Sequence, residues 1–196
     1  VPGEVPTIQE AIDASSDGDT VLVAAGTYVE NIEIDKEIVV IGADRETTII
    51  DGDSSGSVVY FGSNAGMDTY FSGFTVQNGV GQAINSGTHN NHNCGGGIVI
   101  GYSASPLLTD LIVQNNTVDG AGGGIFVEGN NAQLRLSNSI IRNNTAGHAE
   151  PGGGIQIDGG SGSFIHNVEV HDNFAAGKGG GISSSSVLNI TNSVIH

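Results

Sequence analysis

Two carboxylates at equivalent positions of a repeated segment are the first candidates for chemistry. Glu128 and Asp158 each lie three residues after the isoleucine of a Gly-Gly-Gly-Ile segment. Strands stacked in register would hold these side chains about 4.8 Å apart along the stack, close to the carboxyl spacing of about 5 Å in a retaining glycosidase. Because the same position in the other two repeats holds Gly101 and Ser185, ordinary turn acids are the alternative.

A short acidic loop is the candidate calcium site. Asp51, Asp53 and Ser55 place oxygen atoms at alternate positions ahead of Gly56, as in the first half of a calcium-binding loop. The twelfth position, where a glutamate completes such a loop, holds Gly62. A turn between two strands explains the segment as well, so the sequence suggests calcium as a cofactor without requiring it.

The segments that precede the glycine triplets supply a candidate binding edge. Stacking of the repeats would bring polar side chains from neighbouring coils to one edge of the molecule. Phe126, at an outward strand position, would lie on the adjoining face, where its ring could stack on a sugar. We therefore expect a glycan or an ion to be bound by His92, Asp119, Phe126, His148, Glu150 and Lys178.

The longest insertion, residues 79–94, belongs to the same edge. Its His89, His92 and Cys94 carry groups that bind zinc or copper, although their spacing fits no firm metal-site template. A polar surface loop is the alternative. Long loops on a rigid scaffold often carry function, which makes this insertion a place to look for a ligand.

Four Gly-Gly-Gly-Ile segments indicate which secondary-structure elements position these residues. Their isoleucines, Ile98, Ile125, Ile155 and Ile182, lie at intervals of 27, 30 and 27 residues. The alternating apolar residues after the triplets predict short strands with one buried face. Consecutive glycines suit a corner where φ is positive or where a neighbouring coil approaches closely. No helical pattern follows a triplet, which argues against a phosphate-binding glycine loop.

Turn-forming residues recur in three columns between the triplets. Asn, Asp and Gly tolerate left-handed backbone angles and form tight turns. Strands broken by such corners at a constant period predict a parallel β-solenoid, with asparagine side chains stacked as hydrogen-bonded ladders. The columns contain Gly73, Asp110, Asn138, Asn167 and Asn192; Asn78, Asn115, Asn143 and Asp172; and Gly79, Asn116, Asn144 and Asn173.

The two ends of the sequence differ. In residues 7–15, Ile8 and Ile12 fall on one face of a helix whose N-cap is Thr7, and this helix would cover the open sheet edge of the first coil. At the other end, Ile195 and His196 fall within a repeat. We expect a single all-β domain over residues 1–196, with about six or seven coils. We also expect either a longer parent chain or a neighbouring molecule that covers the last coil.

Residues 5–52 resemble the opening of pectin-lyase-like right-handed parallel β-helix proteins. The segment TIQEAIDASSDGDTVLVAAGTYVENI is similar to the start of pectin methylesterases, and EIVVIGADRETTIIDG is similar to the next coil of that superfamily. The glycine triplets resemble polymorphic outer-membrane-protein repeats, as do Val113-x-x-Asn116, Ile141-x-x-Asn144 and Val170-x-x-Asn173, with Val or Ile replacing the usual Phe. Both resemblances imply a right-handed parallel β-helix, a fold that includes lyases, hydrolases, esterases, adhesins and passive spacers.

The missing motifs favour a non-catalytic function. The polygalacturonase motifs NTD, GHG and RIK and the methylesterase motifs QDT, DFIFG and GRPW are absent. Lyases of the superfamily use an Arg or Lys base with calcium, and this sequence has only five basic residues. We expect a secreted or cell-surface module for adhesion, glycan binding or structural assembly. A carbohydrate-active lyase or glycosidase, and a filament subunit that stacks end to end, are the alternatives.

The net charge of the chain limits the kinds of partner that it can bind. The formal net charge is −16, from 21 acidic and 5 basic residues, so nucleic acids and anionic lipid surfaces are repelled. A polyanionic sugar would need a bridging cation. No apolar run approaches the length of about 18 residues that a membrane span requires. The expected partners are therefore a polysaccharide or cell-surface glycan, or a second copy of this chain at the carboxy-terminal edge.

Overall fold

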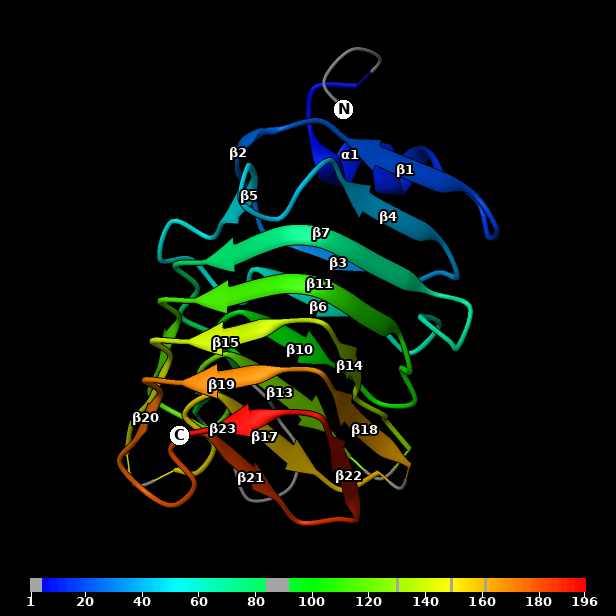
Figure 1. Ribbon diagram of the computed structural model, residues 1–196. Coiled ribbons are helices and arrows are strands. Elements are labelled where there is room, and N and C mark those ends of the chain that lie inside the picture. Colours follow the sequence, from blue (N-terminus) through cyan, green and yellow to red (C-terminus); the bar gives the residue numbers. More distant parts are fainter. Residues whose placement is uncertain (1–4, 84–91, 130, 149, 161) are drawn as a thin grey trace.

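The computed structural model describes residues 5–83, 92–129, 131–148, 150–160 and 162–196. The chain winds as a parallel β-helix, in which equivalent strands of successive coils pair side by side (Figure 1). One path of paired strands, β1-β4-β7-β11-β14-β18-β22, counts seven coils. The expected all-β solenoid with an amino-terminal helix is confirmed.

A 12-stranded sheet, here called the bent sheet, forms the face toward the viewer in Figure 1. It has two limbs, and β7 (Tyr70–Gln77) and β11 (Leu107–Gln114) run through both. The other strands of the first limb are β1 (Thr20–Val23), β4 (Val39–Gly42), β14 (Arg135–Ser137), β18 (Ser163–His166) and β22 (Leu188–Thr191). Those of the second limb are β2 (Gly26–Val29), β5 (Thr48–Asp51), β15 (Ile140–Arg142), β19 (Glu169–His171) and β23 (Val194–Ile195).

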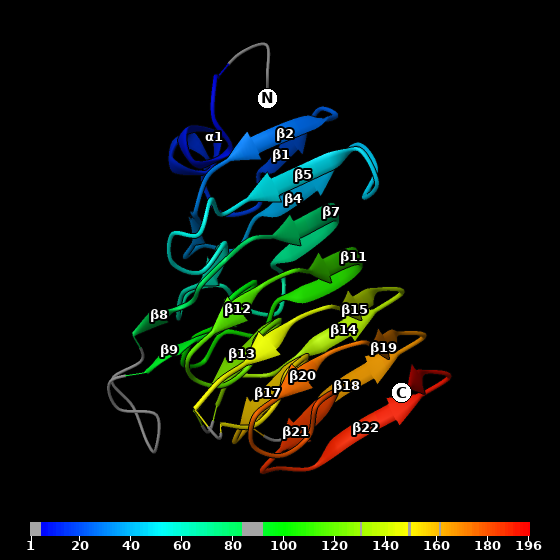
Figure 2. The same cartoon turned by 90° about the vertical axis from the view of Figure 1, so that its left-hand side faces the viewer.

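A second sheet, here called the back sheet, closes the first six coils behind the bent sheet. It contains β3 (Ile32–Ile34), β6 (Val59–Phe61), β10 (Ile98–Ile100), β13 (Ile125–Glu128), β17 (Ile155–Asp158) and β21 (Ile182–Ser184). The corner between the second limb and the back sheet carries β12 (Thr117–Val118), β16 (Thr145–Ala146) and β20 (Phe174–Ala175) (Figure 2). The antiparallel pair β8 (Gln82–Ala83) and β9 (Asn93–Cys94) joins the two ends of the insertion.

The bend between the two limbs is made by one residue in each of the last five coils. Gly73, Asp110, Asn138, Asn167 and Asn192 have φ angles of 81°, 52°, 50°, 53° and 52°. Left-handed backbone is costly for most side chains and is tolerated by Gly, Asn and Asp. The first predicted column is therefore the line along which the sheet folds.

The asparagine ladder lies at the next corner, after the second limb. Asn78, Asn115, Asn143 and Asp172 have positive φ, and the residue that follows turns inward. Asn116 Nδ2 donates to Asn144 Oδ1 at 2.9 Å, and Asn144 Nδ2 donates to Asn173 Oδ1 at 2.9 Å. Asn116 and Asn144 are fully buried, so the predicted ladder is confirmed as part of the interior.

The glycine triplets combine both uses that the sequence suggested. Their first residues, Gly95, Gly122, Gly152 and Gly179, have φ between 60° and 70°. The third residue faces the ladder: a Cβ on Gly124 would lie 2.6 Å from the Gly154 carbonyl oxygen and 2.9 Å from Asn144 Nδ2. A triplet is therefore a left-handed turn followed by backbone packed directly on the next coil.

The helix α1 (Ile8–Ala14) caps the first coil (Figure 2). Its apolar residues Ile8 and Ile12 are buried, and Thr7 accepts from the Glu10 amide as the expected N-cap. The Glu30 carboxylate accepts from the amides of Ile8 and Gln9 at 3.0 Å each. The Lys36 ammonium donates to the Ile12 carbonyl at 3.0 Å. Opposite charges at the two ends suit the helix dipole.

The core is a continuous stack of apolar side chains along the helix axis. Phe71 and Phe74 stack with centroids 4.6 Å apart, on either side of the bend. In the last coil, Ile190, Val194 and Ile195 are 40%, 58% and 44% exposed, and their cover by a neighbouring molecule stays a prediction. No helix in the described part of the chain is long and apolar enough to span a membrane.

Candidate functional site

The predicted binding edge is partly assembled. His92 comes from the end of the insertion and His148 from the loop after β16, and their ring centroids are 5.3 Å apart. His92 Nδ1 lies 3.7 Å from Asp119 Oδ2, and Asp119 Oδ1 accepts from the Asn93 amide at 2.7 Å. Three of the predicted residues therefore meet, with the aspartate also anchoring the base of the insertion.

Glu150 and Lys178 lie on the same edge through their backbones. The Glu150 carbonyl accepts from the Gly177 amide at 3.2 Å, and the Lys178 carbonyl accepts from the Gly152 amide at 3.0 Å. Among the residues that the structure describes, no group of three or more His, Cys, Asp or Glu side chains could hold a metal ion. The edge is thus a set of neighbouring polar groups on consecutive coils.

Cys94 belongs to the interior and does not suit a metal. It is fully buried, and burial raises the pKa of its thiol to about 12. A metal ligand must be the thiolate, which this environment disfavours. The other member of the expected zinc or copper group, His89, lies outside the described residues.

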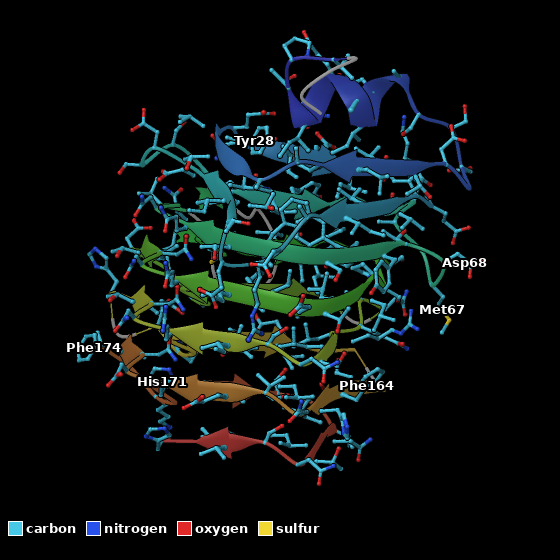
Figure 3. The ribbon with its side chains drawn as sticks, turned by 45° about the horizontal axis from the view of Figure 1, so that its top comes forward. Tyr28, Met67, Asp68, Phe164, His171 and Phe174 are labelled. Carbon is cyan, nitrogen blue, oxygen red and sulfur yellow. The ribbon has the colours of Figure 1, made fainter. Side chains whose placement is uncertain are left out.

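The expectation that Phe126 lies open for stacking on a sugar is wrong. Phe126 is 1% exposed and packs with Cys94, Val99 and Ala121 in a second small core. The segments that precede the triplets fold over the outer face of the back sheet, so a residue that points away from the main core is still covered. The exposed aromatic near this corner is Phe174 on β20, at 60% exposure, and it projects from the edge (Figure 3).

The acid pair has the predicted register. Glu128 on β13 pairs with Asp158 on β17, and both are partly exposed. The Gln156 amide donates a short hydrogen bond to Asp158 Oδ1. Burial, and then the charge of Glu128, raise the pKa of Tyr60. The two acids therefore occupy the same position on adjacent coils, beside a hydrogen-bonding glutamine.

The candidate calcium loop is built as a turn. Asp51 Oδ1 accepts from the Asp53 amide at 3.0 Å, and Asp51 Oδ2 accepts from Gln77 Nε2 at 2.9 Å and from Asn78 Nδ2 at 2.7 Å. Burial by itself raises the pKa of Asp51, but these three hydrogen bonds outweigh it and the pKa is lowered. The best calcium ligand of the loop is thus occupied by protein donors, while Ser55 continues the turn; calcium here stays a prediction.

The bent sheet holds a cleft that the sequence reasoning did not anticipate. It has a volume of about 400 Å³ and follows the outer side of the bend. Its lining comes from the bend and the second limb of the last three coils, with one residue from the β4–β5 loop. The lining residues are Arg45, Asn138, Ser139, Ile140, Asn167, Val168, Glu169, Asn192 and Val194.

The floor of the cleft is a row of exposed amides. Asn138, Asn167 and Asn192 occupy the bend in successive coils, and their side chains are exposed. Asn167 Nδ2 donates to Asn138 Oδ1 at 2.8 Å, and Asn138 Nδ2 donates to Thr109 Oγ1 at 3.3 Å. The column was visible in the sequence as turn residues. Its second consequence, a concave outer surface with an amide on each of the last three coils, was not.

Arg45 closes the upper end of this cleft. Its Nη1 donates to the Asn138 carbonyl at 3.0 Å and lies 3.4 Å from Asp110 Oδ1. Its own carbonyl accepts from Thr75 Oγ1 at 2.7 Å. Arg45 belongs to the second coil, and its side chain, 27% exposed, reaches the bend residues of the fourth and fifth coils.

Comparisons with known proteins agree on the fold. The family model described as "Right handed beta helix region" matches residues 72–196. A crystal structure of pectin methylesterase in complex with hexasaccharide VII is similar over 96% of this chain and 61% of that chain, with a TM-score of 0.58 and 15% identity. A pectin methylesterase mutant in complex with hexasaccharide IV matches over 84% of this chain and 61% of its own, with a TM-score of 0.44 and 10% identity.

Those identities are low enough that the likeness concerns the fold alone. This chain spans 61% of the length of both pectin methylesterase structures. A comparison with curated protein sequences finds no match.

Proposed function

This chain belongs to the right-handed β-helix family, and we propose that it is a non-catalytic glycan-binding module whose ligand lies in the cleft of the bent sheet. The proposal includes a location outside the cell or at its surface, where such ligands occur. The observation that carries it is the row Asn138, Asn167 and Asn192 along the floor of the cleft.

The row of amides suits a polymer of sugars. An asparagine amide both donates and accepts hydrogen bonds, as sugar hydroxyls do. Successive coils are about 4.8 Å apart, close to the length of one residue in an extended polysaccharide, so successive amides can meet successive sugars. Ile140 and Val194 add apolar surface to the wall, which suits the C–H faces of sugar rings.

The charges of the cleft favour a neutral glycan and no catalysis. Glu169 is the one carboxylate among the lining residues that the structure describes, whereas glycoside hydrolysis uses two. Arg45 is balanced by Asp110. The net charge of −16 repels polyanions at long range, so a uronate polymer would bind only through a bridging cation.

A glycosidase is the second candidate, because of one observation. The register of Glu128 with Asp158 gives two partly exposed carboxylates on adjacent coils. Release of reducing sugar from any polysaccharide, abolished in Glu128→Gln or Asp158→Asn, would establish this candidate and replace the binding module. The filament alternative is less favoured, because α1 covers the first coil where another copy would stack.

The proposed function is tested by affinity electrophoresis through gels that contain xylan, mannan, β-glucan or polygalacturonate, with and without calcium. We expect retardation by at least one neutral polysaccharide, and none by polygalacturonate without calcium. Asn167→Gly should weaken the retardation about tenfold, since it removes an amide worth roughly 1.4 kcal/mol in hydrogen bonds while glycine accepts the positive φ.

The matched control is Asn143→Gly, which removes an exposed amide at the same φ on the other corner. Equal retardation of both variants would place the ligand elsewhere. Mobility unchanged by every polysaccharide would refute the proposed function.

A further inference from the structure

The loop between β4 and β5 makes the cleft different at its two ends. Five residues, 43–47, separate these strands, whereas in the later coils one residue turns the bend. The extra residues lie on the outer side of the bent sheet, because the Arg45 carbonyl accepts from Thr75 Oγ1, an outward side chain of the next coil. The loop therefore lies on the same outer surface as the cleft, at one end of it.

This loop is a fixed turn rather than a mobile flap. The Asp44 carbonyl accepts from the amides of Thr47 and Thr48 at 3.0 and 2.8 Å. The Asp44 carboxylate accepts from the Glu46 amide at 2.8 Å. With these contacts and the Thr75 bond, the position of Arg45 is set by its own loop and by the coil below.

The side chain of Arg45 extends the obstruction over two further coils. Its Nη1 reaches Asp110 Oδ1 at 3.4 Å and the Asn138 carbonyl at 3.0 Å. Asn138 is the first amide of the row, so the row begins where the guanidinium ends. A polymer that followed the row upward would meet Arg45 and would have to leave the surface.

We propose that the cleft recognises the end of a neutral polysaccharide chain, with the terminal sugar against Arg45. The inference rests on the proposed glycan-binding function. A guanidinium has five N–H donors. Nη1 of Arg45 makes the contacts to Asp110 and Asn138 described above, and its Nε lies 3.8 Å from Glu46 Oε1. The two Nη2 donors can bind the hydroxyls that only a terminal sugar presents, while the amides of Asn167 and Asn192 bind the sugars that follow.

The first test varies the number of chain ends at constant mass. Xylan, mannan and β-glucan are used intact and after partial acid hydrolysis, and binding of the wild-type protein is measured per gram of polysaccharide. Binding should rise in proportion to the number of chain ends. Retention that is independent of hydrolysis would overturn the inference and leave the proposed function standing, whereas no retention on any preparation would overturn both.

The second test removes the obstruction. Arg45→Ala should lower the affinity for the hydrolysed chains about tenfold and abolish the preference for hydrolysed over intact polysaccharide. If the alanine variant unfolds, Arg45→Gln, which keeps a hydrogen-bonding group, is used in its place. Its preference for hydrolysed over intact polysaccharide should also be lower than that of the wild type. Circular dichroism reports the folding of each variant.

The control is Arg142→Ala. Arg142 lies on the second limb and donates to Gln114 Oε1 at 2.9 and 3.0 Å, away from the cleft lining. The Arg142→Ala variant should keep the wild-type affinity for the hydrolysed chains and the wild-type preference for hydrolysed over intact polysaccharide. If folded Arg45→Ala or Arg45→Gln retains the wild-type preference for chain ends, the inference is wrong.

Discussion

At the scale of single residues, asparagine has different tasks at positions one residue apart. Asn143 has positive φ and an exposed side chain, whereas Asn144 is buried in the ladder. Asn167, at the bend, faces the proposed ligand. The same residue type is used because its amide both donates and accepts and because its backbone tolerates left-handed angles.

Loss of one ladder amide should be costly. In Asn144→Ala, the buried backbone amide of Asn116 loses its acceptor, Asn144 Oδ1, and the carbonyl of Val113 loses the Asn144 Nδ2 donor. Each unsatisfied buried group costs about 1–3 kcal/mol, so we expect the free energy of unfolding to fall by about 3 kcal/mol. Urea denaturation measures this, with Asn143→Gly as the control; a loss as small as that of the control would show that the ladder adds little stability.

Asp51 should make stability depend on acid pH. Its pKa is lowered in the folded protein, because the hydrogen bonds from Gln77, Asn78 and the Asp53 amide outweigh burial. A folded pKa below the unfolded one contributes stability that is present above the unfolded pKa of about 3.9 and is lost as the pH falls through the folded pKa. The melting temperature should therefore fall less steeply between neutral and acid pH for Asp51→Asn than for the wild type. Parallel plots of melting temperature against pH for the two proteins would contradict this.

At the scale of elements, corners decide where side chains lie. The strands are short and their register follows the apolar residues, but the glycine triplets allow neighbouring coils to approach and the ladder to fit between them. The loop 43–47 shows the opposite case, in which extra residues at a corner lie on the outer surface and end a cleft.

The triplets provide a matched pair of substitutions. In Gly124→Ala the new Cβ would meet the Gly154 carbonyl oxygen at 2.6 Å, whereas in Gly181→Ala, at the same repeat position, the nearest atom is the Cγ2 methyl of Ile195 at 3.1 Å. Overpacking against backbone costs about 1–3 kcal/mol. Gly124→Ala should lower the urea midpoint clearly and Gly181→Ala only slightly; similar midpoints would mean that the coils can separate to accept a methyl group.

At the scale of the whole molecule, periodicity made the fold predictable and the site harder to predict. The triplets, the corner columns and the capping helix were all visible in the sequence, because each depends on local backbone chemistry repeated along the chain. Phe126 was misplaced because alternation tells which residues leave the main core, not whether a loop covers them. The cleft was missed because it requires the direction of the bend and the path of Arg45 across three coils.

The position of the ligand is established by a crystal structure of the protein with a neutral oligosaccharide that retards it in affinity gels. We predict sugar density along Asn138, Asn167 and Asn192, with the terminal residue beside Arg45. Density over Glu128 and Asp158, or along the edge of His92 and His148, with an empty cleft in the bent sheet, would contradict this prediction.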